Sequence, residues 1–436
     1  MTINTAKANG KDELELIAAL RKRGGDTGRD VAQRVAEIIE NVRVNGDKAL
    51  IEYTLQFDKV VPDPMEVSRE NMQKAVNNAH PAFISALRHS AENIRRYHEK
   101  QLTHGFVMTD DSGTVMGQRV RGLHRVGLYV PGGTAAYPSS VLMNAIPAKI
   151  AGVKELVMVT PPAKDGGANP DILAAAAVAG VDRIFLVGGA QAVAALAYGT
   201  GLIPKVDKIV GPGNIYVATA KKLLYGIVDI DMIAGPSEIL VIADETADPV
   251  YLAADLLSQA EHDVLASAIL LTDSERIAAE TVKELKLQTE NAPRREIIEQ
   301  SLRDYSAVIT CENLDRAVEL ANELAPEHLE VMTANPWDYL GRLDNAGSIF
   351  LGKYSPEPLG DYYAGPNHVL PTSGTARFFS PLSVDSFVKK SSFISYTKSA
   401  LRRSKDDIIL FAEREGLFAH ANSVRVRFSD ETYANN

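Results

Sequence analysis

The chain has 436 residues, of which 45% are hydrophobic and 23% charged, a composition typical of a globular protein with a substantial buried core. Its formal net charge of -10, from 46 basic against 56 acidic residues, argues against binding to the phosphates of nucleic acid. The apolar stretches are shorter than the ~20 residues that a membrane-spanning helix needs, and no secretory signal core follows Met1. We therefore expect a cytoplasmic protein without a membrane partner.

The first hundred residues are predicted to be mainly helical, because segments 30–39 and 83–87 carry apolar residues at helical spacing among charges. From Val126 onward the pattern changes to short apolar runs that end at Gly or Pro and alternate with helical stretches. This alternation predicts an α/β protein with two mainly parallel sheets. The runs lie at 156–159, 184–187, 209–210 and 239–242, and then at 268–271, 307–309, 329–332 and 348–351.

The end of the chain differs from the rest in composition. After about residue 380 it becomes polar and basic, then helical, which predicts a small third unit. The single cysteine, Cys311, has no partner for an intrachain disulfide and indicates a reducing compartment.

Three glycine-containing turns follow apolar runs, at 129–134, 187–191 and 210–214. At the carboxyl ends of parallel strands, such turns let backbone amides and helix N-termini approach anionic ligands. None of them has the G-x-G-x-x-G signature of dinucleotide binding, and ordinary turn chemistry explains each one equally well. Together they predict a ligand at the strand ends without identifying it.

Four histidines in the second half of the chain, His262, His328, His368 and His420, each have a carboxylate or amide close by in sequence. That setting is typical of metal ligands and general bases, although structural histidines share it. Gln259 lies one helical turn before His262, so both side chains could face one ion. Spacing alone indicates a metal site only weakly.

Glu327 and His328 are the best local candidates for acid-base chemistry, since a helix there ends through Pro326 into an apolar strand. Adjacent residues on a strand point to opposite faces, so only one can face a given pocket unless the chain bends. An ordinary polar helix end is the alternative interpretation. Asp361 lies on a Gly- and Pro-rich loop that is too long for a simple turn, and such loops tend to be functional.

Several motifs, in the same order along nearly the whole chain, resemble those of the histidinol dehydrogenase family. They are YVPGGTAAYPSSVLMN, VGGAQAVAALAYGT, KIVGPGNIYVATAKK, IDMIAGPSEILVIAD, LLSQAEHD, APEHLEV, LGDYYAGPNHVLPT and GLFAHANSV. With the strand pattern, the resemblance predicts an α/β fold of two incomplete Rossmann-like βα sheet domains. We expect an N-terminal helical arm over 1–25, a first α/β domain over 26–128 with 239–380, a second over 129–238, and a small C-terminal unit over 381–436.

The resemblance also implies roles for individual residues. The first domain would carry the zinc and catalytic residues, and the second would hold NAD. Glu327 and His328 match the family's catalytic acid-base pair. The remaining matches are Tyr129, Gln191 and Asn214 for NAD, Gln259, His262, Asp361 and His420 for one zinc ion per subunit, and Ser237, Gln259, His262, His328, Asp361, Glu415 and His420 for the substrate.

The implied reaction is the four-electron oxidation of L-histidinol through L-histidinal to L-histidine, in the last steps of histidine biosynthesis, with two NAD molecules reduced in turn. Zinc would position the substrate, His328 would take the hydroxyl proton, and Glu327 would activate water for the aldehyde stage. Because Cys311 matches none of the motifs, we expect no thiolate intermediate. Family members are homodimers with shared active sites, so Glu415 and His420 are expected in the partner's site.

Other functions would use much the same residues. A related NAD-dependent dehydrogenase acting on another amino alcohol or on a sulfonate alcohol would have a very similar sequence. A zinc-dependent hydrolase could use the same histidines and carboxylates, but it would leave the three glycine turns unexplained. A non-catalytic paralogue that binds an imidazole ligand is the third alternative, although every expected catalytic position is filled.

Overall fold

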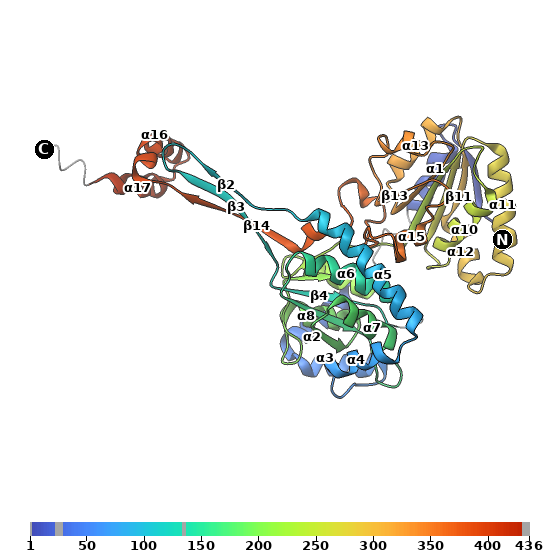
Figure 1. Ribbon diagram of the computed structural model, residues 1–436, viewed down its shortest axis with the longest axis horizontal. Coiled ribbons are helices and arrows are strands. Elements are labelled where there is room, and N and C mark those ends of the chain that lie inside the picture. Colours follow the sequence, from blue (N-terminus) through green and yellow to red (C-terminus); the bar gives the residue numbers. More distant parts are fainter. Residues whose placement is uncertain (1, 22–28, 133–136, 430–436) are drawn as a thin grey trace. The chain divides into compact units, whose positions relative to one another are not determined.

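The computed structural model describes residues 2–21, 29–132 and 137–429 (Figure 1). The chain divides into two compact units. The first comprises residues 1–102 and 122–387, and the second comprises 103–121 and 388–436. No helix among the described residues is both long and apolar enough to cross a membrane.

The first sheet has six parallel strands in the described ranges, in the order β1-β11-β10-β9-β12-β13. Alternate residues of its central strands enter two apolar cores, one on each face, which explains why these strands are continuous apolar runs. Helices α10, α11 and α12 contribute to one core and α1 and α13 to the other. The strands are β1 (Asn4–Lys7), β9 (Glu238–Ala243), β10 (Ser267–Thr272), β11 (Ala307–Thr310), β12 (His328–Met332) and β13 (Ser348–Leu351), and the helices are α1 (Asp12–Arg21), α10 (Pro249–Ala260), α11 (Glu275–Glu290), α12 (Arg295–Tyr305) and α13 (Leu314–Leu324).

The second sheet is also parallel and has the order β6-β5-β4-β7-β8 among the residues described. Its strand order reverses between β4 and β7, which is where open α/β sheets form a ligand crevice at the carboxyl ends of the strands. The strands are β4 (Arg125–Tyr129), β5 (Glu155–Thr160), β6 (Arg183–Leu186), β7 (Lys208–Val210) and β8 (Asp229–Ile230), and the connecting helices are α6 (Pro138–Ile150), α7 (Pro170–Ala179), α8 (Gly189–Tyr198) and α9 (Ile215–Leu224).

The N-terminal hundred residues differ from the helical arm and first-domain assignment expected from sequence. Strand β1 pairs with β11 at the edge of the first sheet, whereas α2 (Arg29–Asn45) and α3 (Asp47–Asp58) pack into the core beneath the second sheet. The reason is that a four-residue polar strand has no apolar signature, and an amphipathic helix does not specify which sheet it covers. Helices α4 (Arg69–Asn78) and α5 (Pro81–His98) complete this region.

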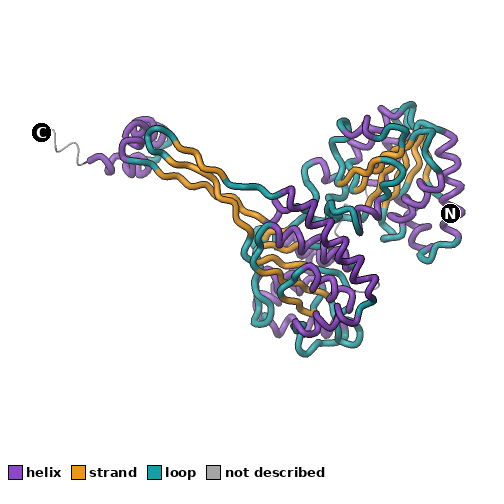
Figure 2. The backbone as a smooth tube through the Cα atoms, in the orientation of Figure 1, coloured by secondary structure: helices purple, strands orange, loops and turns teal. Residues whose placement is uncertain are grey.

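The second unit contains a three-stranded sheet, in the order β14-β3-β2, and two helices within its described part (Figure 2). The hairpin of β2 (Phe106–Thr109) and β3 (Val115–Gly122) was expected in the first domain, but it joins the C-terminal strand β14 (Val388–Ser395). The hydroxyl of Thr397 caps the N-terminus of α16 (Lys398–Arg414) and donates to the Ser112 carbonyl at 2.9 Å. Helix α17 (Phe418–Arg425) follows.

Candidate active site

A cavity of about 420 Å³ in the first unit is lined by residues that follow strands of the second sheet and by residues that precede strands of the first. The second sheet supplies the turn 211–214 after β7, and the first sheet supplies the segment before β12. Seven of the residues predicted from sequence line this cavity: Asn214, Ser237, Gln259, His262, Glu327, His328 and Asp361.

Glu327 and His328 are both anchored on the backbone of Glu238, the first residue of β9. Glu327 Oε2 accepts the Glu238 N–H at 2.9 Å, and His328 Nδ1 lies 3.0 Å from the Glu238 carbonyl oxygen. Because a carbonyl only accepts, Nδ1 carries the hydrogen in the neutral imidazole and Nε2 keeps its lone pair. The imidazole is therefore arranged as a base at Nε2.

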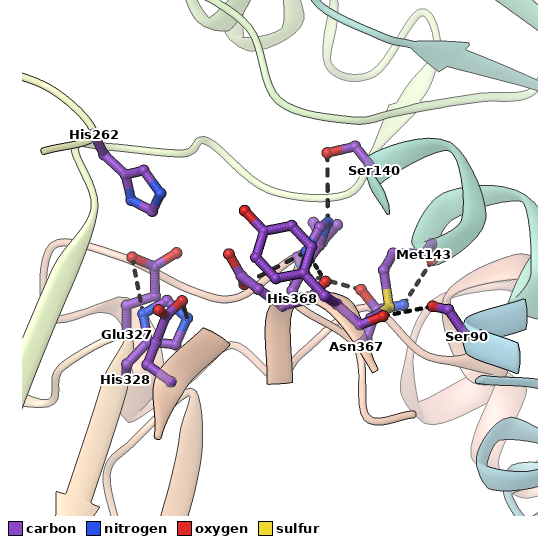
Figure 3. Close-up of polar contacts among 12 residues, drawn as sticks. Ser90, Ser140, Met143, His262, Glu327, His328, Asn367 and His368 are labelled. Carbon is purple, nitrogen blue, oxygen red and sulfur yellow. Dashed lines mark hydrogen bonds and ion pairs between the residues drawn. The ribbon is translucent and has the colours of Figure 1, made fainter. Parts of the chain in front are cut away.

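Both side chains reach the cavity because Glu327 precedes the strand, which begins at His328. Helix α13 ends at Leu324, its C-cap Ala325 has a left-handed φ of 51°, and Pro326 then directs the chain into β12. This bend removes the constraint that adjacent strand residues face opposite sides. Figure 3 shows the His262 ring pointing toward Glu327 and His328.

Burial sets the charge states of this pair. It raises the pKa of Glu327 well above its ordinary value, and it lowers the pKa of His328 to about 4, although Asp361 acts in the opposite direction. The imidazole is thus neutral near neutral pH. A carboxylate with a raised pKa is also a stronger base once it has lost its proton.

Gln259 and His262 lie at the end of α10 and interact directly, with Gln259 Nε2 at 2.9 Å from His262 Nδ1. Gln259 is fully buried, and none of the described residues offers its Oε1 a hydrogen-bond donor. A buried amide oxygen without a donor is costly unless something else binds it. An amide oxygen, an imidazole and the Asp361 carboxylate on the same cavity form a donor set suited to zinc.

Asp361 lies on α15 (Glu357–Tyr362), and its ionised form is favoured. Burial acts to raise its pKa, but the neighbouring histidines, His368 first, bring the pKa down to about 2. His368 Nδ1 is 3.5 Å from Asp361 Oδ1, and its Nε2 is 3.4 Å from Ser140 Oγ on α6 (Figure 3). These contacts position the carboxylate beside the cavity.

Glu357, on the same helix, was not identified from the sequence. Its side chain is buried, its Oε1 lies 3.6 Å from His328 Nε2, and burial raises its pKa to about 9. With His328 and Asp361 it forms a group of donors that all lie within 4.8 Å of one another, the spacing of a possible metal site in the described part of the chain. Glu357 lies four residues before Asp361, one helical turn away, and this spacing could have placed its side chain beside Asp361 from the sequence alone.

The predicted NAD residues lie at the carboxyl edge of the second sheet. The Tyr129 hydroxyl, at the end of β4, accepts the Gly189 N–H at 3.0 Å, at the start of α8. Gln191 is buried, and its Oε1 has no hydrogen-bond partner within the described ranges. Asn214 caps α9 by accepting two backbone N–H groups. Residues 133 and 134 of the first predicted glycine turn, at 129–134, lie outside the described residues.

Glu415 and His420, predicted to contact the substrate, belong to the second unit. Glu415 is the C-cap of α16 and His420 lies in α17, and both side chains are exposed. The residues that line the cavity described above all come from the first unit.

Comparisons with known proteins give a consistent result. The family model described as histidinol dehydrogenase matches residues 21–428. A histidinol dehydrogenase of Clostridium acetobutylicum is 60% identical over 417 residues, covering 96% of this chain and 97% of that protein, and one from Listeria monocytogenes is 57% identical, covering 92% and 94%. A crystal structure of histidinol dehydrogenase from Elizabethkingia anophelis matches with a TM-score of 0.91 and 39% identity, covering 99% of both chains.

Proposed function

This chain belongs to the histidinol dehydrogenase family, and on that premise we propose that it oxidises L-histidinol to L-histidine with Glu327 and His328 as its acid-base pair. The observation that carries this assignment is the anchoring of both side chains on the Glu238 backbone, beside a cavity that Gln259, His262 and Asp361 also line. We also propose a cytoplasmic location for this biosynthetic enzyme.

Gln259, His262 and Asp361 are the proposed zinc ligands in the first unit, and the donor-free amide oxygen of Gln259 supports that assignment. Zinc bound there supplies a positive centre for the imidazole and amino nitrogens of the substrate. His420 completes the proposed set of four, and Ser237 and Glu415 are the further proposed substrate contacts. One ion per subunit is expected.

The first oxidation converts the alcohol to the aldehyde. His328 Nε2, which keeps its lone pair because Nδ1 donates to Glu238, accepts the hydroxyl proton as hydride leaves the carbon. The hydride acceptor is NAD, for which Tyr129, Gln191 and Asn214 are the proposed contacts. The low pKa of His328 keeps its imidazole free to take this proton at neutral pH.

The second oxidation needs water, because the aldehyde must become a hydrate before it can lose another hydride. Ionised Glu327 removes a proton from water as the water oxygen bonds to the aldehyde carbon, and protonated His328 returns its proton to the aldehyde oxygen, which completes the hydrate and restores the neutral imidazole. His328 then accepts a hydroxyl proton of the hydrate as the second hydride leaves to a second NAD, which yields the carboxylic acid. Burial of Glu327 strengthens it as a base for this step.

The Glu327→Gln variant separates these two stages. It should convert histidinal to histidine much more slowly than wild type, while the oxidation of histidinol to the aldehyde retains a larger fraction of its rate. Each stage is measured by supplying histidinol or histidinal in turn, and isotopically labelled water should place one labelled oxygen in the product carboxylate. Equal losses at both stages, or no label in the product, would contradict the role of Glu327.

A homodimer with shared sites is the proposed assembly. The second unit exposes many apolar side chains, which is unusual for a surface without a partner. A second copy of the chain would cover them and bring Glu415 and His420 to its site. The exposed residues include Phe106, Val107, Met108, Ile394, Phe411 and Phe418.

Subunit mixing tests this assembly. Glu327→Gln chains and His420→Ala chains are each expected to form little histidine from histidinol, since each lacks one component of every site. Mixed dimers should regain histidine formation, because one of their two sites then combines intact Glu327 with intact His420. Mixed dimers that are isolated by two affinity tags and stay inactive would show that the sites are not shared.

A further inference from the structure

Glu330 is a buried acid that the proposed reaction does not use. It lies on β12, between β9 and β13, and it is 1% exposed. Because side chains alternate along a strand, Glu330 and His328, two residues earlier, point to the same face of the sheet. A carboxyl group in such a position costs stability compared with an apolar side chain of similar size, which indicates a role other than folding.

One oxygen of Glu330 holds the start of helix α15. Its Oε1 accepts the N–H of Glu357, the first residue of that helix, at 2.7 Å. The N-cap of α15 is Pro356, whose side chain makes no capping hydrogen bond, so Glu330 supplies the acceptor from the neighbouring sheet. A helix of six residues is too short to be stable alone. Its position therefore depends on contacts of this kind.

The other oxygen of Glu330 is directed to a second acid. Oε2 meets no N–H or O–H donor among the described residues, and the side chain hydrogen-bonds with that of Asp255 on α10. Two carboxyl groups can form such a bond only by sharing a proton. Burial raises the pKa of Glu330 well above its ordinary value, which keeps that proton in place near neutral pH. Glu330 therefore holds the helix as a neutral acid.

Helix α15 is held at its other end as well. Ser90 Oγ on α5 donates to the carbonyl of Tyr362, the last residue of α15, at 2.6 Å (Figure 3). Asp361, a proposed zinc ligand, lies between these two bonds, one helical turn after Glu357. A shift of the helix start would therefore move the Asp361 carboxylate relative to the other proposed ligands.

We propose that Glu330 is a positioning residue for the metal centre, which places the Asp361 carboxylate for zinc by holding the first N–H of α15. This inference rests on the proposed zinc ligands, and it adds a residue that touches neither the metal nor the substrate. The role depends on the reach of an oxygen atom from β12 to the helix and not on negative charge, because the carboxyl group is neutral.

Two substitutions separate reach from charge. Glu330→Gln keeps an oxygen at the same reach, and its amide N–H can donate to Asp255, so its zinc affinity should stay within about twofold of wild type. Glu330→Asp keeps the carboxyl group but shortens the side chain by about 1.5 Å, which breaks the bond to Glu357. Its zinc affinity should fall about tenfold or more. Titration of the metal-free proteins with zinc against a chromophoric chelator measures both affinities without turnover.

The kinetics of Glu330→Asp should show the same selectivity. At saturating zinc, its KM for histidinol should rise about tenfold, because Asp361 is also a proposed substrate contact. Its KM for NAD should stay within about twofold of wild type, since the proposed NAD contacts lie on the second sheet.

Glu13→Asp is the matched control. Glu13 is a fully buried acid on α1, on the opposite face of the first sheet, and its carboxylate accepts the backbone N–H groups of Asn9 and Gly10 at 3.0 and 2.8 Å. The same shortening there also breaks buried hydrogen bonds, but away from α15. Thermal melts should show both Asp variants folded and less stable than wild type, whereas zinc affinity should fall only in Glu330→Asp.

Two results would overturn the role of Glu330. One is a Glu330→Asp variant that binds zinc as tightly as wild type, and the other is a Glu330→Gln variant that loses as much affinity as Glu330→Asp. Wild type that binds no zinc would overturn the proposed ligands, and this inference with them.

Discussion

The amino edge of the first parallel sheet and the carboxyl edge of the second differ sharply in chemistry. The first sheet presents buried titratable groups, with Glu327, His328, Glu330 and Glu357 all at least nine-tenths buried. The second presents glycine turns, helix N-termini and neutral side chains such as Gln191 and Asn214. Buried ionisable groups with shifted pKa values suit proton transfer, whereas backbone amides suit the holding of an anionic ligand. Substitutions at the first edge should therefore lower kcat, and those at the second should raise the KM for NAD.

The largest effect is expected at the first edge, from His328→Asn. Loss of the base at Nε2 should reduce kcat by about a thousandfold while the KM for NAD changes little, because proton transfer is lost and dinucleotide contacts are kept. Steady-state rates with histidinol measure both. His89→Asn, on the exposed face of α5, is the control and should match wild type. If the kcat of His328→Asn stays within tenfold of wild type, the imidazole of His328 is not the base in the reaction.

A smaller effect, on the KM for NAD and not on kcat, is expected at the second edge from Gly188→Ala. The added Cβ would overlap Pro161, so the turn must shift away from Tyr129 and Gly189. The KM for NAD should rise about tenfold with little change in kcat. Gly341→Ala adds a Cβ with no neighbour within 4 Å and is the control. A fall in kcat at a constant KM for NAD would contradict the assignment of dinucleotide binding to this edge.

The buried acids of the first edge should also make stability depend on pH. Burial raises the pKa of Asp255 on α10 to about 6, beside Glu330, whose pKa is raised as well. A carboxyl with a higher pKa in the folded protein takes up protons on folding. Its stabilising contribution is therefore present below the unfolded pKa, near 4, and is lost as pH rises to about 6.

Asp255→Asn removes this dependence. Relative to wild type, the variant should gain about 1 to 3 kcal/mol in free energy of unfolding between about pH 4 and about pH 7. Urea unfolding of both proteins at the two pH values measures the difference. If the variant and wild type differ by the same amount at both, Asp255 does not carry a raised pKa in the folded protein.

The smallest effect is expected from Cys311→Ala. This thiol is buried in the core of the first sheet, and burial raises its pKa to about 11, so it stays protonated and poorly nucleophilic. Turnover should match wild type at both oxidation stages. A folded variant that loses the aldehyde stage would indicate a thiolate intermediate in place of the water route.

Much of the difference between the two sheet edges could be predicted from sequence, but the contacts that create it could not. The apolar runs indicated the two sheets, and the helix end before Pro326 marked Glu327 and His328. Their common anchor on Glu238 depends on the pairing of β12 with β9, which lie about ninety residues apart in the chain. Periodicity within one segment carries no information about that pairing.

Other features were missed because their elements are short. Glu357 lies in α15, a six-residue helix that is too brief to show a helical pattern. Strand β1 is a polar edge strand of four residues, and the β2–β3 hairpin pairs with a strand that follows about 270 residues later. Each is stabilised by contacts distant in sequence rather than by its local propensity.

The most direct test of the account is the amount of NADH formed for each L-histidinol consumed by the purified protein, before and after removal of bound metal. We expect two NADH per histidinol, loss of activity on chelation, and recovery when zinc is added. One NADH per histidinol, or full activity in the metal-free protein, would contradict the proposed reaction.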